Sequence, residues 1–325
     1  MKVTSYKCQF CNNYFINYRT NFDDFSKKKF EVLFCNFCEY GKTLLKKNIN
    51  LKSYYPKQYY GNNNSGRFNF LIEHISIYLR KLRVKLFYKQ QIKKKYLDIG
   101  CGRGIEAQIL KKKNWTVYCT ELNNNYINKL KKKNIHAYKS YDLEKLKVKN
   151  NYFDFITSWH NLEHQININK NIDIVHKILK KNGTFIFEVP NIKSFQSIIS
   201  NDNWIHLEAP RHVYHFTSQF LKNFLKKKKF KIVSIETFSL EYGPIGMICS
   251  IYNIFLKEKN LLFKILYKNP KLKIKYPKLF YINAIILLIT SIFIIPFGFC
   301  LEFVLSKFYL GGVLRVIAKK NNTNT

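Results

Sequence analysis

The chain has 325 residues and a formal charge of +36, with 56 lysines and arginines against 20 acidic residues. This length allows one well-filled core with appended segments. A charge of this size is typical of nucleic-acid-binding proteins. The lysines, however, form runs such as 111–113 and 226–229 at expected helix ends and loops. We therefore interpret them as solvated surface and do not expect a nucleic-acid partner, whereas an anionic membrane surface would suit them.

The N-terminal segment is marked by two C-x-x-C pairs, Cys8 with Cys11 and Cys35 with Cys38. Two such knuckles can supply four thiolates to a closed tetrahedral zinc site, which is structural rather than catalytic. We therefore expect a zinc ribbon over residues 1–50. Disulfides are the weaker alternative, because no segment resembles a signal peptide.

Residues 51–92 are expected to connect this ribbon to a core domain. Tyr54 begins the stretch YYPKQYYG, which precedes a polar turn, and residues 68–92 have the pattern of an amphipathic helix. Tyr55 and Tyr59 have two open interpretations, as flanks of a bound ligand or as packing tyrosines.

The most informative stretch is YLDIGCGRG, residues 96–104, a short apolar strand followed by a loop with glycine at every second position. Glycine tolerates positive φ and lets the backbone approach a ligand, and the helix that follows points its N-terminal amides at the same place. The next strand-like run ends on Glu121, whose carboxylate can accept ribose hydroxyls. Dinucleotide loops have the spacing G-x-G-x-x-G, whereas Gly102 and Gly104 are only two apart.

This D-x-G-x-G-x-G pattern resembles the first motif of class I S-adenosylmethionine-dependent methyltransferases. The resemblance covers roughly residues 90–240 and returns at 311–319. It implies a Rossmann-like α/β fold with a seven-stranded sheet, in which the loop backs the methionine and ribose of the cofactor and Asp142 meets the adenine. The cofactor-binding residues implied by the resemblance are Asp98, Gly100, Gly102, Gly104, Glu121, Asp142, Leu143 and Trp159.

Further stretches resemble the same family, and some of them resemble one bacterial branch of it that is similar to the ubiquinone-biosynthesis O-methyltransferases. The run 151–159 resembles the fourth strand and leads into HNLEH at 160–164, while 178–190 resembles the turn and the fifth strand. The sequence PRHVYHFT at 210–217 resembles a stretch of the same branch, in which a YP-x-x-YY segment also folds over the cofactor as a lid.

Methyl transfer is an in-line displacement, and an oxygen nucleophile also needs a base to remove its proton. Histidine is the natural base, so His164 is the first candidate, with His160 beside it and Glu163 to orient it; His212 and His215 are further candidates. The branch binds a divalent ion through E-x-x-E-H at this point, where this chain has His160 first. The structural alternative for Glu163 and His164 is a helix cap with core polar contacts.

The C-terminal third contains an uncharged run, residues 282–301, that is long enough to cross a bilayer. Residues 311–319, however, resemble the family's final strand, and a single crossing would leave that strand on the wrong side of the membrane. We therefore expect a hydrophobic helical hairpin inserted before the last strand, bending near Pro296 and entering one leaflet. Burial of this run against a partner subunit is the alternative.

These predictions divide the chain into a ribbon (1–50), a linker or lid with a helix (51–92), the methyltransferase core (93–240), a hydrophobic insertion (241–310) and the last strand with the tail (311–325). The expected function is O-methylation of a small-molecule, lipid-linked or glycan acceptor at the cytoplasmic face of the membrane, with residues 280–306 as the attachment. The alternative is an RNA or protein methyltransferase that grips a polymer with ribbon and lysines. Methylation of base or glutamine nitrogen is disfavoured, because Ser158–Asn161 stands where an N/D-P-P-Y stretch would be. The sequence leaves the oligomeric state open.

Overall fold

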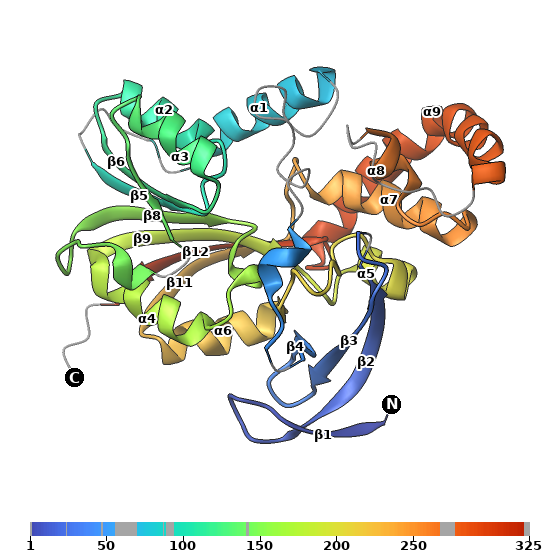
Figure 1. The fold of residues 1–325 in the computed structure, drawn as a ribbon, viewed down its shortest axis with the longest axis horizontal. Coiled ribbons are helices and arrows are strands. Elements are labelled where there is room, and N and C mark those ends of the chain that lie inside the picture. Colours follow the sequence, from blue (N-terminus) through green and yellow to red (C-terminus); the bar gives the residue numbers. More distant parts are fainter. Residues whose placement is uncertain are drawn as a thin grey trace. The chain divides into compact units, whose positions relative to one another are not determined.

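The structure is a computed structural model that describes residues 2–23, 25–46, 48–55, 70–86, 88, 94–140, 143–266 and 277–321 (Figure 1). The chain forms two compact units, and each is described by itself. Unit 1 comprises Met1–Glu73, Pro190–Phe220 and Glu236–Leu314, and unit 2 comprises His74–Val189, Leu221–Ile235 and Arg315–Thr325. Most of the expected YP-x-x-YY lid lies outside the described residues.

Unit 2 is built on a seven-stranded sheet with the order β11-β12-β9-β8-β5-β6-β7. Every strand pair from β9 to β7 is parallel, which confirms the expected mostly parallel, Rossmann-like sheet. The strands are β5 (Lys95–Ile99), β6 (Thr116–Glu121), β7 (His136–Lys139), β8 (Phe153–Trp159), β9 (Leu179–Pro190), β11 (Phe230–Glu236) and β12 (Val313–Lys320). The last of these, β12, lies inside the sheet between β11 and β9.

Helices connect these strands, as the alternating sequence pattern requires. They are α1 (Phe70–Val84), α2 (Ile105–Lys112), α3 (Asn124–Lys131), α4 (Ile168–Ile178) and α6 (Ser218–Lys227). Leu110 of α2 and Leu130 of α3 pack with the buried strand residues Tyr96, Val117 and Ala137 in one apolar cluster. This packing fixes where β5 ends and α2 begins.

A buried polar chain crosses the middle of this sheet. Asp98 and Thr157 are register partners on β5 and β8. The Thr157 hydroxyl donates to the Asp98 carboxyl at 3.0 Å and shares a 2.6 Å hydrogen bond with the Tyr96 hydroxyl. Burial, assisted by the charge of Glu106, raises the pKa of Asp98 to about 8. Asp98 is therefore mostly protonated at neutral pH.

Unit 1 contains a five-stranded sheet with the order β1-β2-β3-β4-β10. The strands are β1 (Val3–Lys7), β2 (Tyr14–Phe22), β3 (Lys29–Cys35), β4 (Tyr40–Thr43) and β10 (Tyr214–His215), all antiparallel to their neighbours. The fifth strand thus comes from the PRHVYHFT stretch. The Tyr40 ring stacks on Phe220 at a centroid distance of 4.8 Å, so residues far apart in the chain share this small core.

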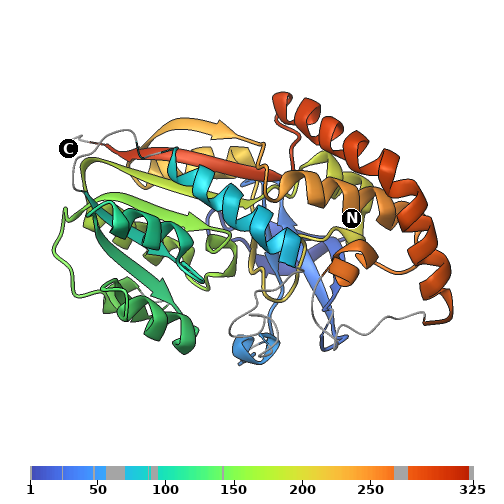
Figure 2. The same cartoon turned by 90° about the horizontal axis from the view of Figure 1, so that it is seen from above.

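The other part of unit 1 is helical. It consists of α5 (Phe195–Ser200), α7 (Gly243–Phe255), α8 (Leu261–Leu266) and α9 (Pro277–Lys307). In Figure 2, α7 and α9 lie side by side, and their side chains Ile248, Tyr252 and Leu287 form one apolar cluster with Ile294. Residues 267–276, between α8 and α9, lie outside the described part of the chain.

The expected hairpin that turns back near Pro296 is wrong, because α9 runs as one helix of 31 residues with Pro296 inside it. Proline removes one backbone hydrogen bond and often kinks a helix. The helix continues through this position. A Cβ added to Gly298 would lie only 2.8 Å from Ile248 of α7, so the turn after the proline is held close against its neighbour.

The shifted pKa of Asp98 predicts how the stability of the fold depends on pH. The folded state keeps the Asp98 proton up to about pH 8, whereas an unfolded aspartate loses it near pH 3.9. Between these values the unfolded chain binds fewer protons, so this group lowers the free energy of unfolding as pH rises. Replacing Asp98 by Asn removes the titration at nearly constant shape. The melting temperature of Asp98→Asn relative to the native chain should therefore rise from pH 5 to pH 8, and parallel pH profiles would contradict the assignment.

Candidate active site

The glycine loop at the carboxyl end of β5 has a backbone that only glycine adopts easily. Gly100, Gly102 and Gly104 have φ values of 72°, 55° and 62°. A Cβ at Gly100 would lie 2.3 Å from the Asn161 amide, and one at Gly104 would lie 2.5 Å from Leu130. A Cβ at Gly102 would meet nothing within 4 Å. The outer two glycines thus shape the loop, and the middle one presents bare backbone to open space, as a cofactor cradle requires.

Glu121 fastens this loop to the end of β6. Its Oε2 accepts the Gly102 N–H at 2.8 Å, and its Oε1 accepts the N–H groups of Leu122 and Asn123 at 2.7 and 3.0 Å. A carboxylate offers about four lone-pair positions, so one on Oε2 remains for a ribose hydroxyl. Glu121 is only 7% exposed. The residue therefore fits an adenosyl cofactor and also sets the path of the loop.

Two residues that the sequence analysis missed position Trp159. Glu106, in the first turn of α2, accepts the Trp159 indole N–H at 2.6 Å and forms an ion pair of 2.8 Å with Arg83. The Arg83 guanidinium also lies over the Trp159 ring, 4.4 Å from its centroid. This arrangement orients the ring at the carboxyl end of β8. An acid in the first helical turn suits the helix dipole, but no sequence pattern links it to Arg83.

The other two expected cofactor residues follow β7. Leu143 begins a short turn, Leu143–Lys145, and is 2% exposed. Asp142, expected to meet the adenine, lies outside the described residues. The observed loop, Glu121 and Trp159 are thus the described parts of the candidate cofactor site.

A buried charge cluster lies just beyond β8. His160 has a φ of 48°, and its ring lies 3.6 Å from the Glu163 carboxyl and 3.4 Å from that of Glu188 on β9. Arg315 on β12 pairs with Glu188 at 2.5 Å. Burial alone would lower the pKa of His160, but the two carboxylates outweigh it and raise that pKa to about 9. His160 therefore carries a positive charge at neutral pH and donates protons rather than accepting them.

The charge cluster also fixes the state of Glu188. Burial would raise the pKa of Glu188, but its hydrogen bond to His160 and the charge of Arg315 hold that pKa well below its usual range. Glu188 and Arg315 were missed in the sequence analysis. They belong to strands that are distant in sequence and meet only in the folded sheet.

The predicted base, His164, ends the short turn Leu162–His164 and is half-buried. Its neighbour Glu163 is fully buried. The backbone N–H of His164 donates to the Asn161 carbonyl at 3.1 Å. The turn therefore places both residues at the carboxyl edge of β8, where open α/β sheets bind their ligands.

The remaining histidine candidates, His212 and His215, make hydrogen bonds within unit 1. The His215 ring shares a 2.9 Å hydrogen bond with Thr43 of β4, and burial holds the pKa of His215 well below its usual range. The His212 ring meets the His206 carbonyl at 2.8 Å. Arg211 is buried and pairs with Asp23 at 2.5 Å. These contacts tie the PRHVYHFT stretch to its own unit.

The four N-terminal cysteines lie together, with all their sulfurs within 4.8 Å of one another. The Cys8 and Cys38 sulfurs are 3.8 Å apart, and those of Cys11 and Cys35 are 3.6 Å apart. A tetrahedral zinc with bonds of about 2.3 Å separates its thiolates by about 3.8 Å. The backbone N–H groups of Phe10 and Cys38 point at the sulfurs of Cys8 and Cys35, both at 3.4 Å, which is the hydrogen bonding that a metal-bound thiolate favours.

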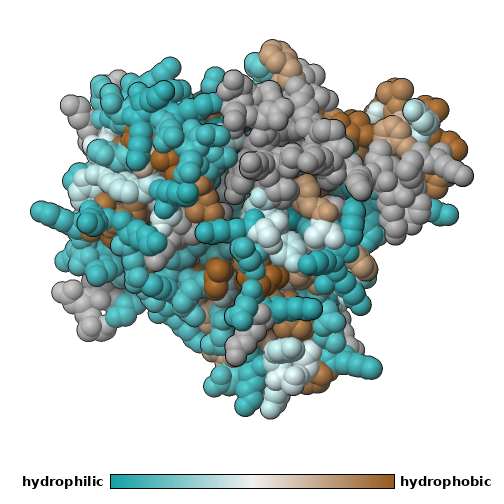
Figure 3. Space-filling view, viewed as in Figure 1, coloured by the Kyte–Doolittle hydropathy of each residue, from teal (hydrophilic) through white to brown (hydrophobic). Residues whose placement is uncertain are grey.

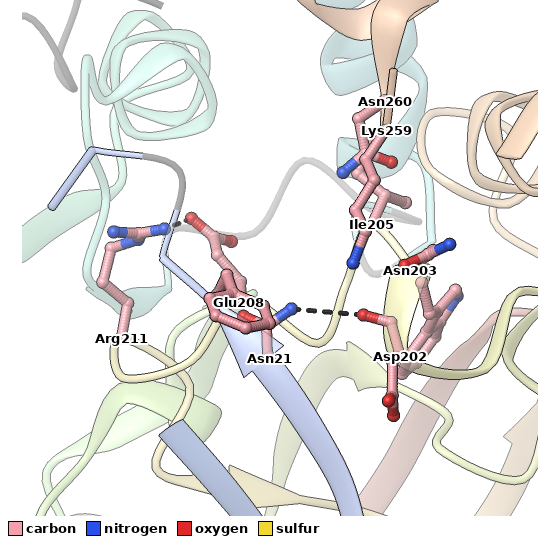
Figure 4. Close-up of a pocket in the computed structure, with 10 residues that line it drawn as sticks. Asn21, Asp202, Asn203, Ile205, Glu208, Arg211, Lys259 and Asn260 are labelled. Atoms are coloured by element: carbon pink, nitrogen blue, oxygen red, sulfur yellow. Dashed lines mark hydrogen bonds and ion pairs between the residues drawn. The ribbon is translucent and has the colours of Figure 1, made fainter. Parts of the chain in front are cut away.

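A pocket in unit 1 lies between β2, the loop after α5 and the start of α8 (Figure 4). Asn21 donates to the Asp202 carbonyl across one side, and Glu208 pairs with Arg211 at the other. The cavity measures about 30 Å³, which is the volume of about one water molecule. It is too small for an acceptor substrate.

Comparisons with known proteins agree with this geometry. The family described as "Methyltransferase domain" matches residues 71–235, slightly more than half of the chain. The chain is also 30% identical over 139 residues to the uncharacterized protein MJ1252 of Methanocaldococcus jannaschii, which covers 43% of this chain and 49% of that protein. The chain thus spans about half the length of this curated relative.

Two solved structures illustrate the wider similarity. A SAM dependent methyltransferase from Archaeoglobus fulgidus is 23% identical, with coverage of 77% of this chain and 94% of that chain and a TM-score of 0.45. A putative sarcosine dimethylglycine methyltransferase from Galdieria sulphuraria is 14% identical, with coverage of 83% and 98% and a TM-score of 0.47. The family assignment does not depend on these two likenesses.

The assignment rests on the family match, and it agrees with the strand order and with the loop. The match includes the glycine loop, the acid at the end of β6 and the turn after β8. These are the elements that the structure brings to one edge of the sheet of unit 2. The chain belongs to the methyltransferase-domain family.

Proposed function

We propose that the chain methylates an oxygen atom of a small-molecule, lipid-linked or glycan acceptor at a membrane face. The observation that carries this proposal is the histidine and glutamate turn after β8, Leu162–His164. An oxygen nucleophile must lose a proton, and a half-buried histidine at the ligand-binding edge of the sheet can accept it. The resemblance of this turn and of PRHVYHFT to the ubiquinone-biosynthesis O-methyltransferases supports the same acceptor class.

S-adenosylmethionine supplies an activated methyl group on a sulfonium. The residues of the chain bind and orient, with Gly102 lining the approach, Glu121 taking a ribose hydroxyl and Trp159 closing the side near β8. Holding nucleophile and methyl in line converts a bimolecular step into an effectively unimolecular one. In this proposal Asp142 and Leu143 complete the adenine end of the site, and Asp98 stays protonated behind the loop.

The two histidines have different roles in this proposal. His160, held between two carboxylates with a pKa raised to about 9, stays charged and positions the turn and β9. His164 accepts the proton of the acceptor, and Glu163 fixes the turn. The branch holds a divalent ion at this turn; here Glu163 and His164 keep ligand atoms within 4.8 Å of one another, and His160 stands in place of the branch's glutamate.

One observation favours the second candidate, methylation of RNA or protein. The N-terminal sheet exposes Tyr6, Tyr14 and Phe37, which are 49%, 53% and 75% exposed. Lys7 lies over the Tyr14 ring at 5.4 Å. Exposed aromatic rings with adjacent lysines suit a single-stranded polymer.

The four cysteines are proposed to hold one structural zinc ion. Burial and the hydrogen bond that Cys35 donates to the Cys11 sulfur raise the pKa of Cys35 to about 11, and a bound cation would stabilise four thiolates at one place. The ion would tie the turn after β1 to the turn after β3. It plays no part in the methyl transfer, because four protein ligands close its coordination shell.

The acceptor class can be tested with labelled cofactor. Purified native protein, tritiated S-adenosylmethionine and an extract of the producing cells should yield label in the organic-solvent or small-molecule fraction. Label recovered in RNA or protein would refute the proposed class and support the second candidate. A boiled-enzyme control removes chemical methylation.

The roles of His160 and His164 can be separated by substituting each in turn. His164→Ala should lower the rate by about 10²–10⁴, the usual cost of losing a general base, with cofactor affinity unchanged. His160→Gln, which keeps a donor but not the charge, should change the rate less and should lower thermal stability by removing the positive charge that lies between two buried carboxylates. An unchanged rate in His164→Ala at every pH would contradict the base assignment.

The zinc site can be tested by elemental analysis. The purified chain should contain about one zinc ion, and Cys35→Ser should lose it together with thermal stability. Cys119→Ser alters a buried thiol of unit 2 and is the matched control that should retain the metal. A metal-free chain with the native melting temperature would refute the site.

A further inference from the structure

We propose that α9 lies in the plane of a membrane surface, with one side fastened to unit 1 and the opposite side buried in lipid. This inference concerns how the chain attaches to a membrane, and it does not depend on the identity of the methyl acceptor. In this arrangement α9 neither crosses the membrane nor forms a re-entrant hairpin.

A narrow stripe along α9 is buried against the rest of unit 1. The residues that face unit 1 are Asn283, Leu287, Ile294, Gly298 and Glu302, which recur at helical spacing. Only 11% of the apolar window is buried, although its mean hydropathy is 2.6. Most of the helix circumference is therefore apolar and exposed, and Figure 3 shows hydrophobic side chains gathered where α9 lies in Figure 1.

In addition, α9 is fastened at two distant places to the same layer. Near its middle, the Tyr252 hydroxyl of α7 shares a 3.1 Å hydrogen bond with Thr290. Near its end, Glu302 accepts the Gly312 N–H at 2.7 Å and the Gln196 side-chain amide of α5 at 3.0 Å. These anchors are about 18 Å apart at 1.5 Å per residue.

That layer is itself held on the polar part of unit 1. Gln196 of α5 donates to the Gly243 carbonyl at the start of α7, and Asn253 near the end of α7 donates to the Asn203 carbonyl at 2.8 Å. Asp202 in turn accepts the Thr20 N–H of β2 at 3.0 Å. A helix that crossed the bilayer would have to carry α5 and α7 with it, and the polar groups that hold them cannot enter hydrocarbon at low cost.

The polar side chains of α9 favour lipid as the partner of its exposed side. Thr290 and Ser291 are the polar side chains within the run from Ile285 to Phe299. Thr290 lies on the side that contacts Tyr252 of α7, and Ser291 donates its hydroxyl to the Leu288 carbonyl of the same helix at 2.8 Å. Polar groups satisfied inside the helix are what a water-free environment requires. A protein partner would be expected to find hydrogen-bonding groups on this face.

Charge and aromatic residues agree with this placement. Tyr281 and Tyr309 are 75% and 62% exposed at the two ends of the run, and amphipathic tyrosine rings favour the headgroup region. Lys307, at the end of α9, extends over the Phe303 ring. The surplus of lysine in the chain attracts anionic lipids. An ordinary interfacial helix has a polar face that contacts water. In α9 the corresponding face packs against the rest of unit 1.

The proposal can be tested with the native full-length protein and vesicles of phosphatidylcholine with and without phosphatidylglycerol. The native chain should float with vesicles, more strongly with the anionic lipid. The double variant Ile289→Asp/Phe293→Asp should lose flotation while still binding S-adenosylhomocysteine, which shows that its core is folded. The control Ile166→Asp/Val233→Asp changes two exposed apolar residues of unit 2 and should float like the native chain.

Depth measurements distinguish a flat helix from a crossing one. Ile282, Phe293 and Val304 share one exposed face of α9 at spacings of three turns. Each is replaced by cysteine in a Cys300→Ser background and labelled with a fluorophore. Quenchers placed at different depths in the lipid should report the same shallow depth at all three positions. A deep centre with shallow ends would show a crossing helix and overturn the proposal. Absence of vesicle binding, with or without a dimer that the double Asp variant abolishes, would also overturn it.

Discussion

The candidate site depends on the hydrogen bonds between one carboxylate and three backbone amides. Glu121 accepts the N–H groups of Gly102, Leu122 and Asn123, and thereby joins the loop after β5 to the end of β6. Charge-assisted bonds of this kind are the strong ones. The loop can keep its left-handed backbone because Gly100 and Gly104 leave room for Asn161 and Leu130. Without this carboxylate, the loop would lose the hydrogen bond at Gly102 that joins it to the end of β6.

The carboxyl edge of β8 is governed by a second constraint, the burial of three charged groups and a histidine together. His160, Glu163, Glu188 and Arg315 balance one another, since two carboxylates face one imidazolium and one guanidinium. A buried charge that loses its partner is strongly destabilising. The cluster therefore connects β9 and β12 to the turn that carries His164. The final strand thus contributes to the site through Arg315 as well as to the sheet.

The sequence predicted the parts of this structure that local spacing controls. The glycine loop, the acid at the end of β6 and the order of strands follow from short sequence patterns. Each of the two cysteine pairs is also a short pattern, C-x-x-C. Arg83, Glu106, Glu188 and Arg315 were missed, since each acts through a partner on another element and no pattern records such pairs. The hairpin at Pro296 was predicted from a local rule and is wrong, because α9 continues through the proline, with Gly298 packed against Ile248 of α7.

The most direct test of this assignment is a calorimetric titration of the native full-length chain with S-adenosylhomocysteine and, separately, with NADH. The spacing of the glycines and the position of Glu121 predict saturable binding of S-adenosylhomocysteine at about one site per chain. The same geometry predicts no binding of NADH, because Gly102 and Gly104 are two residues apart, whereas the last two glycines of a dinucleotide loop are three apart. Binding of NADH with none of S-adenosylhomocysteine would contradict the assignment of the loop, and with it the proposed roles of Glu121, Trp159 and His164.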